Sequence, residues 1–157
     1  MNIEKPSPKN NLLIAGAGNP LRHDDGFGPE IIKILRERSG NFAGDLLDIG
    51  TDGLALLDEM QKYKRVILID AVNMGAKPGA VRVFTPDEAK IKINSDTMST
   101  HGFGLAEVIK LMEQLDIKVD FKIIGIQPEN ISFGEGLSEA VAKKIPEIIE
   151  LVLKSSC

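Results

Sequence analysis

Four polar side chains of this chain stand at the ends of apolar runs or at the start of a helical pattern. They are Asp24, Asp25, Asp70 and His101. Two carboxylate oxygens and one imidazole nitrogen that converge on one site suit zinc, nickel or another first-row divalent ion, with open positions left for water or substrate. We therefore test the hypothesis that carboxylates of this set and His101 form a site for a divalent metal.

The positions of these residues predict that they share one edge of a sheet. The acidic pair lies in a glycine-rich turn, residues 16–28, that follows an apolar run at residues 12–15. Asp70 follows the run 66–69, which has no polar alternation and is typical of a central strand buried on both faces. In an open parallel sheet, ligands bind outside the carboxyl ends of the strands. We therefore expect the acidic pair, Asp70 and His101 at that edge.

Each residue also has a simpler structural explanation. Aspartates before a helix often cap it or interact with its dipole, so one member of the acidic pair could cap while the other faces the cleft. Asp70 could be a turn former at a strand end, and a lone histidine near a helix start is more often structural than a ligand. His23 lies in the same turn beside Arg22 and is expected to face solvent, so it ranks below His101 as a ligand. The coincidence of these polar groups at one predicted edge favours the metal site.

The elements that must position these residues follow from the hydrophobic pattern. Short runs rich in Val, Ile and Leu predict strands at residues 12–15, 45–49, 65–69, 80–84 and 119–126. Helical periodicity predicts helices at residues 29–38, 54–63, 105–115 and 137–153. Strands that alternate with helices indicate an α/β fold with a mostly parallel sheet covered on both faces.

Punctuating residues refine these boundaries. Pro29 fits the first turn of its helix, and Pro146 should kink or divide the last one. Ser99 and Thr100 are the expected N-caps of the helix that carries Leu105. Residues 86–98 are expected to form a short helix followed by a surface loop.

Length and composition bound the class of protein. A chain of 157 residues favours one domain, here residues 11–157, after a flexible tail at residues 1–10. The net charge of −4 offers no electrostatic footprint for nucleic acid, and no apolar run approaches the roughly 20 residues that cross a bilayer. The single cysteine, Cys157, excludes an intramolecular disulfide and fits a reducing cytoplasm.

Several common catalytic patterns are missing from the sequence. It has no His-Glu-x-x-His helix, no Gly-x-Ser-x-Gly elbow, no Walker-type phosphate loop and no interior cysteine nucleophile. The turn Gly16-Ala17-Gly18 is like the start of a dinucleotide fingerprint, but Leu21 stands where its third glycine should be. The acidic pair would also repel a pyrophosphate, which disfavours nucleotide binding.

The ordered set of motifs resembles the hydrogenase maturation endopeptidases, which process the large subunit of nickel-iron hydrogenases. The resemblance runs from about Asn11 to Leu153. It rests on Gly-x-Gly-Asn-x-Leu-x-x-Asp-Asp-Gly-x-Gly at residues 16–28, Ile69-Asp70-Ala71, Asn73-Met74-Gly75, Pro78-Gly79, Ser99-Thr100-His101 and Gly125-Ile126-Gln127-Pro128-Glu129. The last segment is most similar to the branch that serves hydrogenase 3-type enzymes.

This resemblance implies a fold and a set of site residues. The fold is a three-layer α/β/α sandwich with a twisted, mostly parallel five-stranded sheet, in a cytoplasmic monomer. Asp25, Asp70 and His101 are the residues that match the family's catalytic, metal-contacting trio. Some relatives carry glutamate where this chain has Asp25.

The implied activity is that of an endopeptidase, a hydrolase that removes the C-terminal extension of a nickel-iron hydrogenase large-subunit precursor after nickel insertion. Such processing, classed as aspartyl-type, activates the hydrogenase. The nickel is presented by the precursor, although other divalent metals are expected to substitute in vitro, and the trio would complete its coordination. Hydrolysis could then use a metal-polarised carbonyl or a metal-activated water, or positioning with an aspartate as general base.

Two other classes of function remain open at this point. A signalling receiver domain also has an acidic pair after its first strand and an aspartate ending its third. It would need a lysine at the end of the fifth strand, where this chain has Gly125-Ile126-Gln127-Pro128. A stand-alone metal peptidase would need its own metal affinity, and a trio with one histidine is expected to bind metal weakly.

Overall fold

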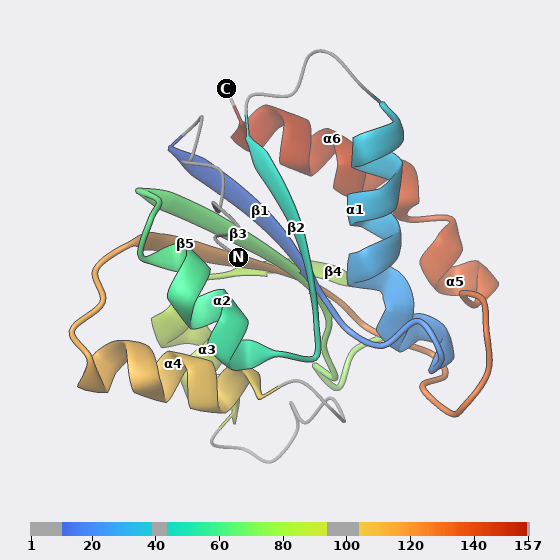
Figure 1. Cartoon of the computed structure of the whole chain (residues 1–157). Coiled ribbons are helices and arrows are strands. Elements are labelled where there is room, and N and C mark those ends of the chain that lie inside the picture. Colours follow the sequence, from blue (N-terminus) through green and yellow to red (C-terminus); the bar gives the residue numbers. More distant parts are fainter. Residues whose placement is uncertain (1–10, 39–43, 94–103, 157) are drawn as a thin grey trace, which may run out of the picture.

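A computed structural model of the chain describes residues 11–38, 44–93 and 104–156. In this part of the chain, a twisted sheet lies between two layers of helices (Figure 1). The expected tail at residues 1–10 lies outside the described residues, as do His101, Ser99, Thr100 and Cys157. None of the helices within the described ranges is long and apolar enough to cross a membrane.

The elements follow the predicted alternation of strands and helices. The strands are β1 (Leu12–Ala17), β2 (Asp45–Gly50), β3 (Arg65–Ala71), β4 (Val81–Phe84) and β5 (Asp120–Ile126). The helices are the 3₁₀ turn η1 (His23–Gly26), α1 (Phe27–Glu37), α2 (Gly53–Met60), α3 (Pro86–Ile93), α4 (Leu105–Gln114), α5 (Glu139–Ala142) and α6 (Ile145–Ser155). The five predicted strands and four predicted helical regions are therefore confirmed.

The sheet has the order β2-β1-β3-β5-β4, which places β3 at its centre. Strands β1, β2, β3 and β5 run parallel, while β4 pairs antiparallel with β5. The central strand is buried on both sides, as its unbroken apolar run predicts. Its register sets Asp70 opposite Gly125 of β5, at the edge where the parallel strands end.

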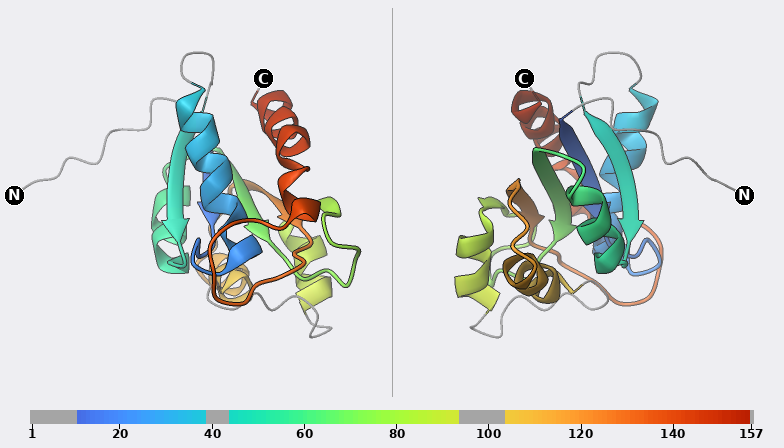
Figure 2. Two further views of the ribbon diagram at one scale, coloured as in Figure 1. Left: turned by 90° about the vertical axis from the view of Figure 1, so that its right-hand side faces the viewer. Right: turned by 60° about the vertical axis from the view of Figure 1, so that its left-hand side comes forward.

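Two separate apolar cores hold the layers together, one on each face of the sheet. Helices α2, α3 and α4 cover one face, and α1, α5 and α6 cover the other (Figures 1 and 2). Alternate strand residues feed the two cores, so Leu13 and Leu68 face the first while Ile14 and Ile69 face the second. Each fully buried side chain of this size contributes about 1.5–3 kcal/mol to folding. The three-layer α/β/α sandwich is confirmed.

Two details of the helices differ from the sequence-based expectation or refine it. The predicted helix 137–153 is divided into α5 and α6, and Pro146 lies in the first turn of α6, as its missing N–H allows. The expected N-caps of the helix with Leu105 are wrong, because the N-cap of α4 is Gly104. The short helix expected within residues 86–98 is α3.

The start of α1 lies unusually close to the sheet. A Cβ atom added at Gly28 would meet the backbone carbonyl oxygens of Ala17, at the end of β1, and of Ile69, near the end of β3. A Cβ atom at Gly16 would in turn meet the backbone of Gly28. Only glycine permits this approach, so these two motif positions set how near α1 comes to the carboxyl ends of the central strands.

We predict that Gly28→Ala lowers the free energy of unfolding by at least about 2 kcal/mol, because backbone atoms on two strands cannot yield to the added methyl group. Urea unfolding followed by circular dichroism measures the change. Gly104→Ala is the matched control, since the three described atoms nearest to a Cβ atom there all belong to the flexible side chain of Glu107. Equal stability of the two variants would contradict the close-packing argument.

Candidate functional site

A compact turn after β1 carries Asp25 to the carboxyl edge of the sheet. The 3₁₀ turn η1 buries Asp25, and the backbone amide of Asn19 donates a hydrogen bond of 3.0 Å to its Oδ2 atom. Gly18 has a φ of +135°, and a Cβ atom there would overlap the carbonyl oxygen of Asp25. The glycine therefore allows the turn to fold back onto the residue that it presents.

Asp70 is the second-last residue of the central strand β3 and a fully buried carboxylate. Neither of its oxygens has a hydrogen-bond partner among the residues that the structure describes. Burial raises the pKa of Asp70 well above its usual range, and the negative charge of Asp25 raises it further. The nearby Ala71 amide favours the ionised form, but it does not reach hydrogen-bond geometry with either oxygen. Buried polar groups are normally satisfied, so this exception marks a candidate functional group.

Asp24, the neighbour of Asp25, has the opposite environment. It is fully buried, and its carboxylate accepts hydrogen bonds from the amides of Glu129, Asn130 and Ser138 at 2.9, 3.0 and 2.7 Å. The Ser138 hydroxyl donates a fourth bond of 2.8 Å. The adjacent aspartates thus differ in role. Asp24 holds the turn against the loop after β5, while the negative charge of Asp25 raises the pKa of Asp70. The N-cap of α1 is Gly26, so neither aspartate holds the N-cap position.

His23 does not simply face solvent, as its sequence position suggested. It is half-buried, with a φ of +44°, and its Nδ1 atom lies 3.0 Å from the carbonyl oxygen of Gly136. A carbonyl can only accept, so Nδ1 carries the proton of this bond. The ring packs on the backbone of Gly134, where a Cβ atom would collide with it. His23 therefore fastens the turn to the same loop that Asp24 holds.

Gln127 is a site-supporting residue whose role the sequence did not reveal. It is buried directly after β5, and its Oε1 atom accepts hydrogen bonds from the amides of Met74 and Ala76 at 2.6 and 3.3 Å. Its Nε2 atom donates to Oδ1 of Asn73 at 3.2 Å. These bonds fix the segment that follows Asp70. A polar residue at the end of an apolar strand was the only available signal.

Of the predicted trio, the described residues include Asp25 and Asp70, which interact electrostatically. His101 lies outside them, so its membership stays a prediction. Within residues 11–38, 44–93 and 104–156, no three His, Cys, Asp or Glu side chains are grouped to hold a metal ion. The donor chemistry of the two carboxylates fits a divalent metal, since Asp70 has two buried oxygens with no hydrogen-bond partner in the described part of the chain.

The model of the HycI family, described as hydrogenase maturation protease, matches residues 29–155. The chain belongs to the hydrogenase maturation protease family. It is similar to the hydrogenase expression/formation protein HupD of Thiocapsa roseopersicina, with 33% identity over 148 residues, which cover 91% of this chain and 66% of that protein. The chain thus spans about two thirds of the length of that relative.

Solved structures agree with this assignment to the hydrogenase maturation proteases. The hydrogenase maturating endopeptidase HybD from Escherichia coli superposes with a TM-score of 0.78 at 28% identity, over 92% of this chain and 91% of that one. The [NiFe] hydrogenase maturation protease HybD from Thermococcus kodakarensis superposes with a TM-score of 0.75 at 29% identity, over 94% and 99%. The predicted family, the α/β fold and the class of enzyme, a peptidase, are confirmed.

The receiver-domain alternative is wrong, because the chain belongs to another family and its sheet has a different strand order. Receiver domains have the parallel strand order 2-1-3-4-5. Here β5 pairs directly with β3, and β4 forms an antiparallel edge strand. The acidic pair and the third aspartate therefore belong to a different arrangement of strands, in which the glycine-rich turn is clamped by the loop after β5.

We predict that Asp24→Ala lowers the free energy of unfolding by about 3–5 kcal/mol, because it leaves three backbone amides and a hydroxyl without their acceptor. Asp52→Ala is the matched control. Asp52 is exposed and accepts one hydrogen bond, from the Ala55 amide at 3.0 Å, as the N-cap of α2. That variant should lose about 1 kcal/mol. Chemical denaturation of both variants measures the difference, and similar losses would contradict the clamp.

We predict that Asp70→Asn stabilises the fold at neutral pH. The pKa of Asp70 is higher in the folded protein than in the unfolded chain, where it is about 4. Below pH 4 the carboxyl is protonated in both states, so its burial destabilises the fold least. As pH rises toward the folded pKa, the unfolded chain ionises first and the free energy of unfolding falls. In metal-free buffer at pH 7, the asparagine variant should gain at least about 1 kcal/mol. The gain should vanish near pH 3.5.

Thermal unfolding across this pH range measures the Asp70→Asn effect. The control is Asp120→Asn, because Asp120 is exposed and its Oδ2 atom lies 3.6 Å from Nε of Arg65. Removal of this surface charge should change stability by less than about 1 kcal/mol. An Asp70→Asn variant that is less stable than the parent at pH 7 would show that the carboxylate is satisfied in solution.

Proposed function

We propose that this chain is the endopeptidase that removes the C-terminal extension of a nickel-iron hydrogenase large-subunit precursor once nickel has been inserted. It acts in the cytoplasm as a monomer, and the nickel already bound in the precursor is the feature that it recognises. Family membership supports the peptidase and its place in hydrogenase maturation. The similar protein from Thermococcus kodakarensis is a [NiFe] hydrogenase maturation protease, which supports the class of hydrogenase.

The observation that carries the proposal is the pair of aspartates at the carboxyl edge of the sheet. Asp70 is buried without hydrogen-bond partners in the described part of the chain, and the charge of Asp25 disfavours its ionisation. A divalent cation between the two carboxylates would relieve this repulsion and satisfy the unpaired oxygens. In the free protein, the carboxylates of Asp25 and Asp70 are already positioned to bind a cation that the substrate carries.

His101 is the third member of the proposed site, on the strength of the family resemblance. An imidazole added to two carboxylates gives a mixed nitrogen and oxygen donor set that suits nickel. Because nickel is held by the precursor, these residues need only complete its coordination. A precursor without nickel would offer no such contact, which gives selectivity for the metal-loaded state.

The chemical step is hydrolysis of one peptide bond. Water adds to the scissile carbonyl carbon, the carbon–nitrogen bond breaks, and the leaving amine takes up a proton, which yields the mature C-terminus and a free peptide. Nickel beside the carbonyl can act as a Lewis acid. An aspartate of the site can accept a proton from the attacking water as a general base. Docking at the metal would also hold the peptide in place for attack.

We predict that the purified protein shortens the nickel-loaded large-subunit precursor and leaves the nickel-free precursor intact. Asp25→Ala, Asp70→Ala and His101→Ala should each reduce processing at least about 100-fold, because each removes a metal contact. Intact-mass spectrometry of the precursor follows the loss of the C-terminal peptide. Circular dichroism should show that each variant remains folded.

The control variant is Asp52→Ala, which removes an exposed aspartate at the start of α2 and should process at the parental rate. Equal cleavage of nickel-free and nickel-loaded precursors would contradict recognition through the metal. Turnover of short peptides by the isolated protein with added metal would instead favour the stand-alone metal peptidase.

A further inference from the structure

The turn that presents Asp25 is joined to the loop after β5 by a short ladder of backbone hydrogen bonds. Residues Arg22 and Gly134 form a parallel bridge. The amide of Gly134 donates to the carbonyl of Leu21, and the amide of His23 donates to the carbonyl of Gly134, each at 2.8 Å. Figure 2 shows the two segments side by side at one end of the molecule. With the Asp24 bonds, this ladder makes the two segments one fixed unit.

This unit presents large apolar side chains to solvent. Phe133 is 83% exposed and Leu21 is 57% exposed. The guanidinium carbon of Arg22 lies 5.3 Å from the centre of the Phe133 ring, and Nε of Arg22 donates to the carbonyl of Ile131 at 3.0 Å. The ring is thus held in place by a cation–π contact while most of its surface remains in water. Burial within this fold does not account for Phe133, whereas an exposed, preorganised aromatic side chain is a common anchor in protein interfaces.

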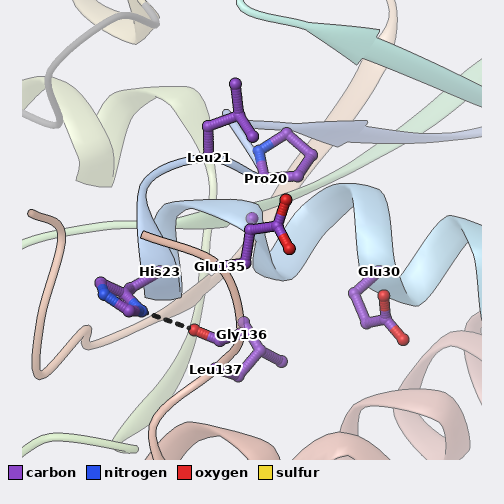
Figure 3. Close-up of a pocket in the computed structure, with 8 residues that line it drawn as sticks. Pro20, Leu21, His23, Glu30, Glu135, Gly136 and Leu137 are labelled. Atoms are coloured by element: carbon purple, nitrogen blue, oxygen red, sulfur yellow. Dashed lines mark hydrogen bonds between the residues drawn. The ribbon is translucent and has the colours of Figure 1, made fainter. Parts of the chain in front are cut away.

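A pocket of about 210 Å³ lies between the two segments of this unit and α1, and Leu21 is part of its lining. Pro20, Leu21 and Leu137 give it apolar walls, and Glu30 and Glu135 contribute carboxylates. Figure 3 shows Glu135 reaching toward Pro20 from the loop after β5, while Glu30 projects from α1. Neither glutamate forms a hydrogen bond or ion pair with the residues that the structure describes. The pocket therefore combines an apolar lining with negative charge that is available to a partner.

We propose that this docking surface, made of Leu21, Phe133 and the pocket with Glu30 and Glu135, binds a segment of the precursor that is apolar and carries lysine or arginine. The inference rests on the proposed function and deepens it. An apolar side chain of the precursor packs on Phe133 and Leu21, and a cationic side chain enters the pocket. This binding adds affinity that does not depend on the metal.

Two observations favour the precursor over a second copy of this chain. The docking surface includes Leu21, which lies in the same clamped turn as Asp25, so a partner bound there is held close in the chain to the proposed site. In a two-fold contact each surface would meet its own copy, which would bring the carboxylates of Glu30 and Glu135 toward like charges. A cationic partner instead neutralises them.

We predict that Phe133→Ser and Leu21→Ser each raise KM for the nickel-loaded precursor at least about fivefold, whereas kcat falls less than about twofold, since neither side chain touches the reacting bond. Glu135→Lys should raise KM by a similar factor and weaken the dependence of KM on salt concentration. Leu115→Ser is the matched control, because Leu115 is 61% exposed at the far end of α4, and KM should stay at the parental value.

The outcomes separate the two proposals. Parental KM values in Phe133→Ser and Glu135→Lys, with normal cleavage by the parent protein, would overturn the docking surface and leave the endopeptidase function in place. Failure of the parent protein to cleave the nickel-loaded precursor would overturn the proposed function and this inference together. Sedimentation that shows a dimer of the parent and a monomer of Phe133→Ser would assign the surface to self-association.

Discussion

The rest of the site depends on the electrostatic cost of burying Asp70 close to Asp25. A buried carboxylate near the end of the central strand, with no hydrogen-bond partner in the described part of the chain, opposes folding at neutral pH. The surrounding structure must hold it there. Two apolar cores, one on each face of β3, provide most of the compensating free energy. Proteins commonly accept such a local cost at positions that serve function rather than stability.

Asp24 and Asp70 are buried to the same extent but differ in the hydrogen bonds that they accept. Both are fully buried acids. Asp24 accepts four hydrogen bonds, so its carboxylate is stabilised by donors within the protein. Asp70 has none from the described residues and keeps its capacity for a partner from outside. For two buried aspartates such as Asp24 and Asp70, the number of hydrogen bonds that each one accepts is thus a better guide to function than its position in a sequence motif.

The sequence predicted what depends on local pattern and missed what depends on distant backbone. Apolar runs located the strands, and strand ends located Asp25 and Asp70, because parallel strands bring their carboxyl ends to one edge. The partners of Asp24 are amides of residues 129–138, and any residue type has an amide, so no sequence signal identifies them. The positive φ of His23 likewise reflects contacts with that loop. The N-cap at Gly104 was missed because side-chain preferences pointed to Ser99 and Thr100.

The separation of the Asp24 contacts along the chain has a consequence for synthesis. Asp24 is 105 to 114 positions from the residues that satisfy it. A nascent chain that has released the glycine-rich turn from the ribosome still lacks the loop after β5, and contacts of such long range form late. The turn around Asp25 cannot reach its final shape until this loop has been translated. The arrangement around Asp25 is therefore assembled only after the loop after β5 has been translated, so translation products that end before this loop do not carry it.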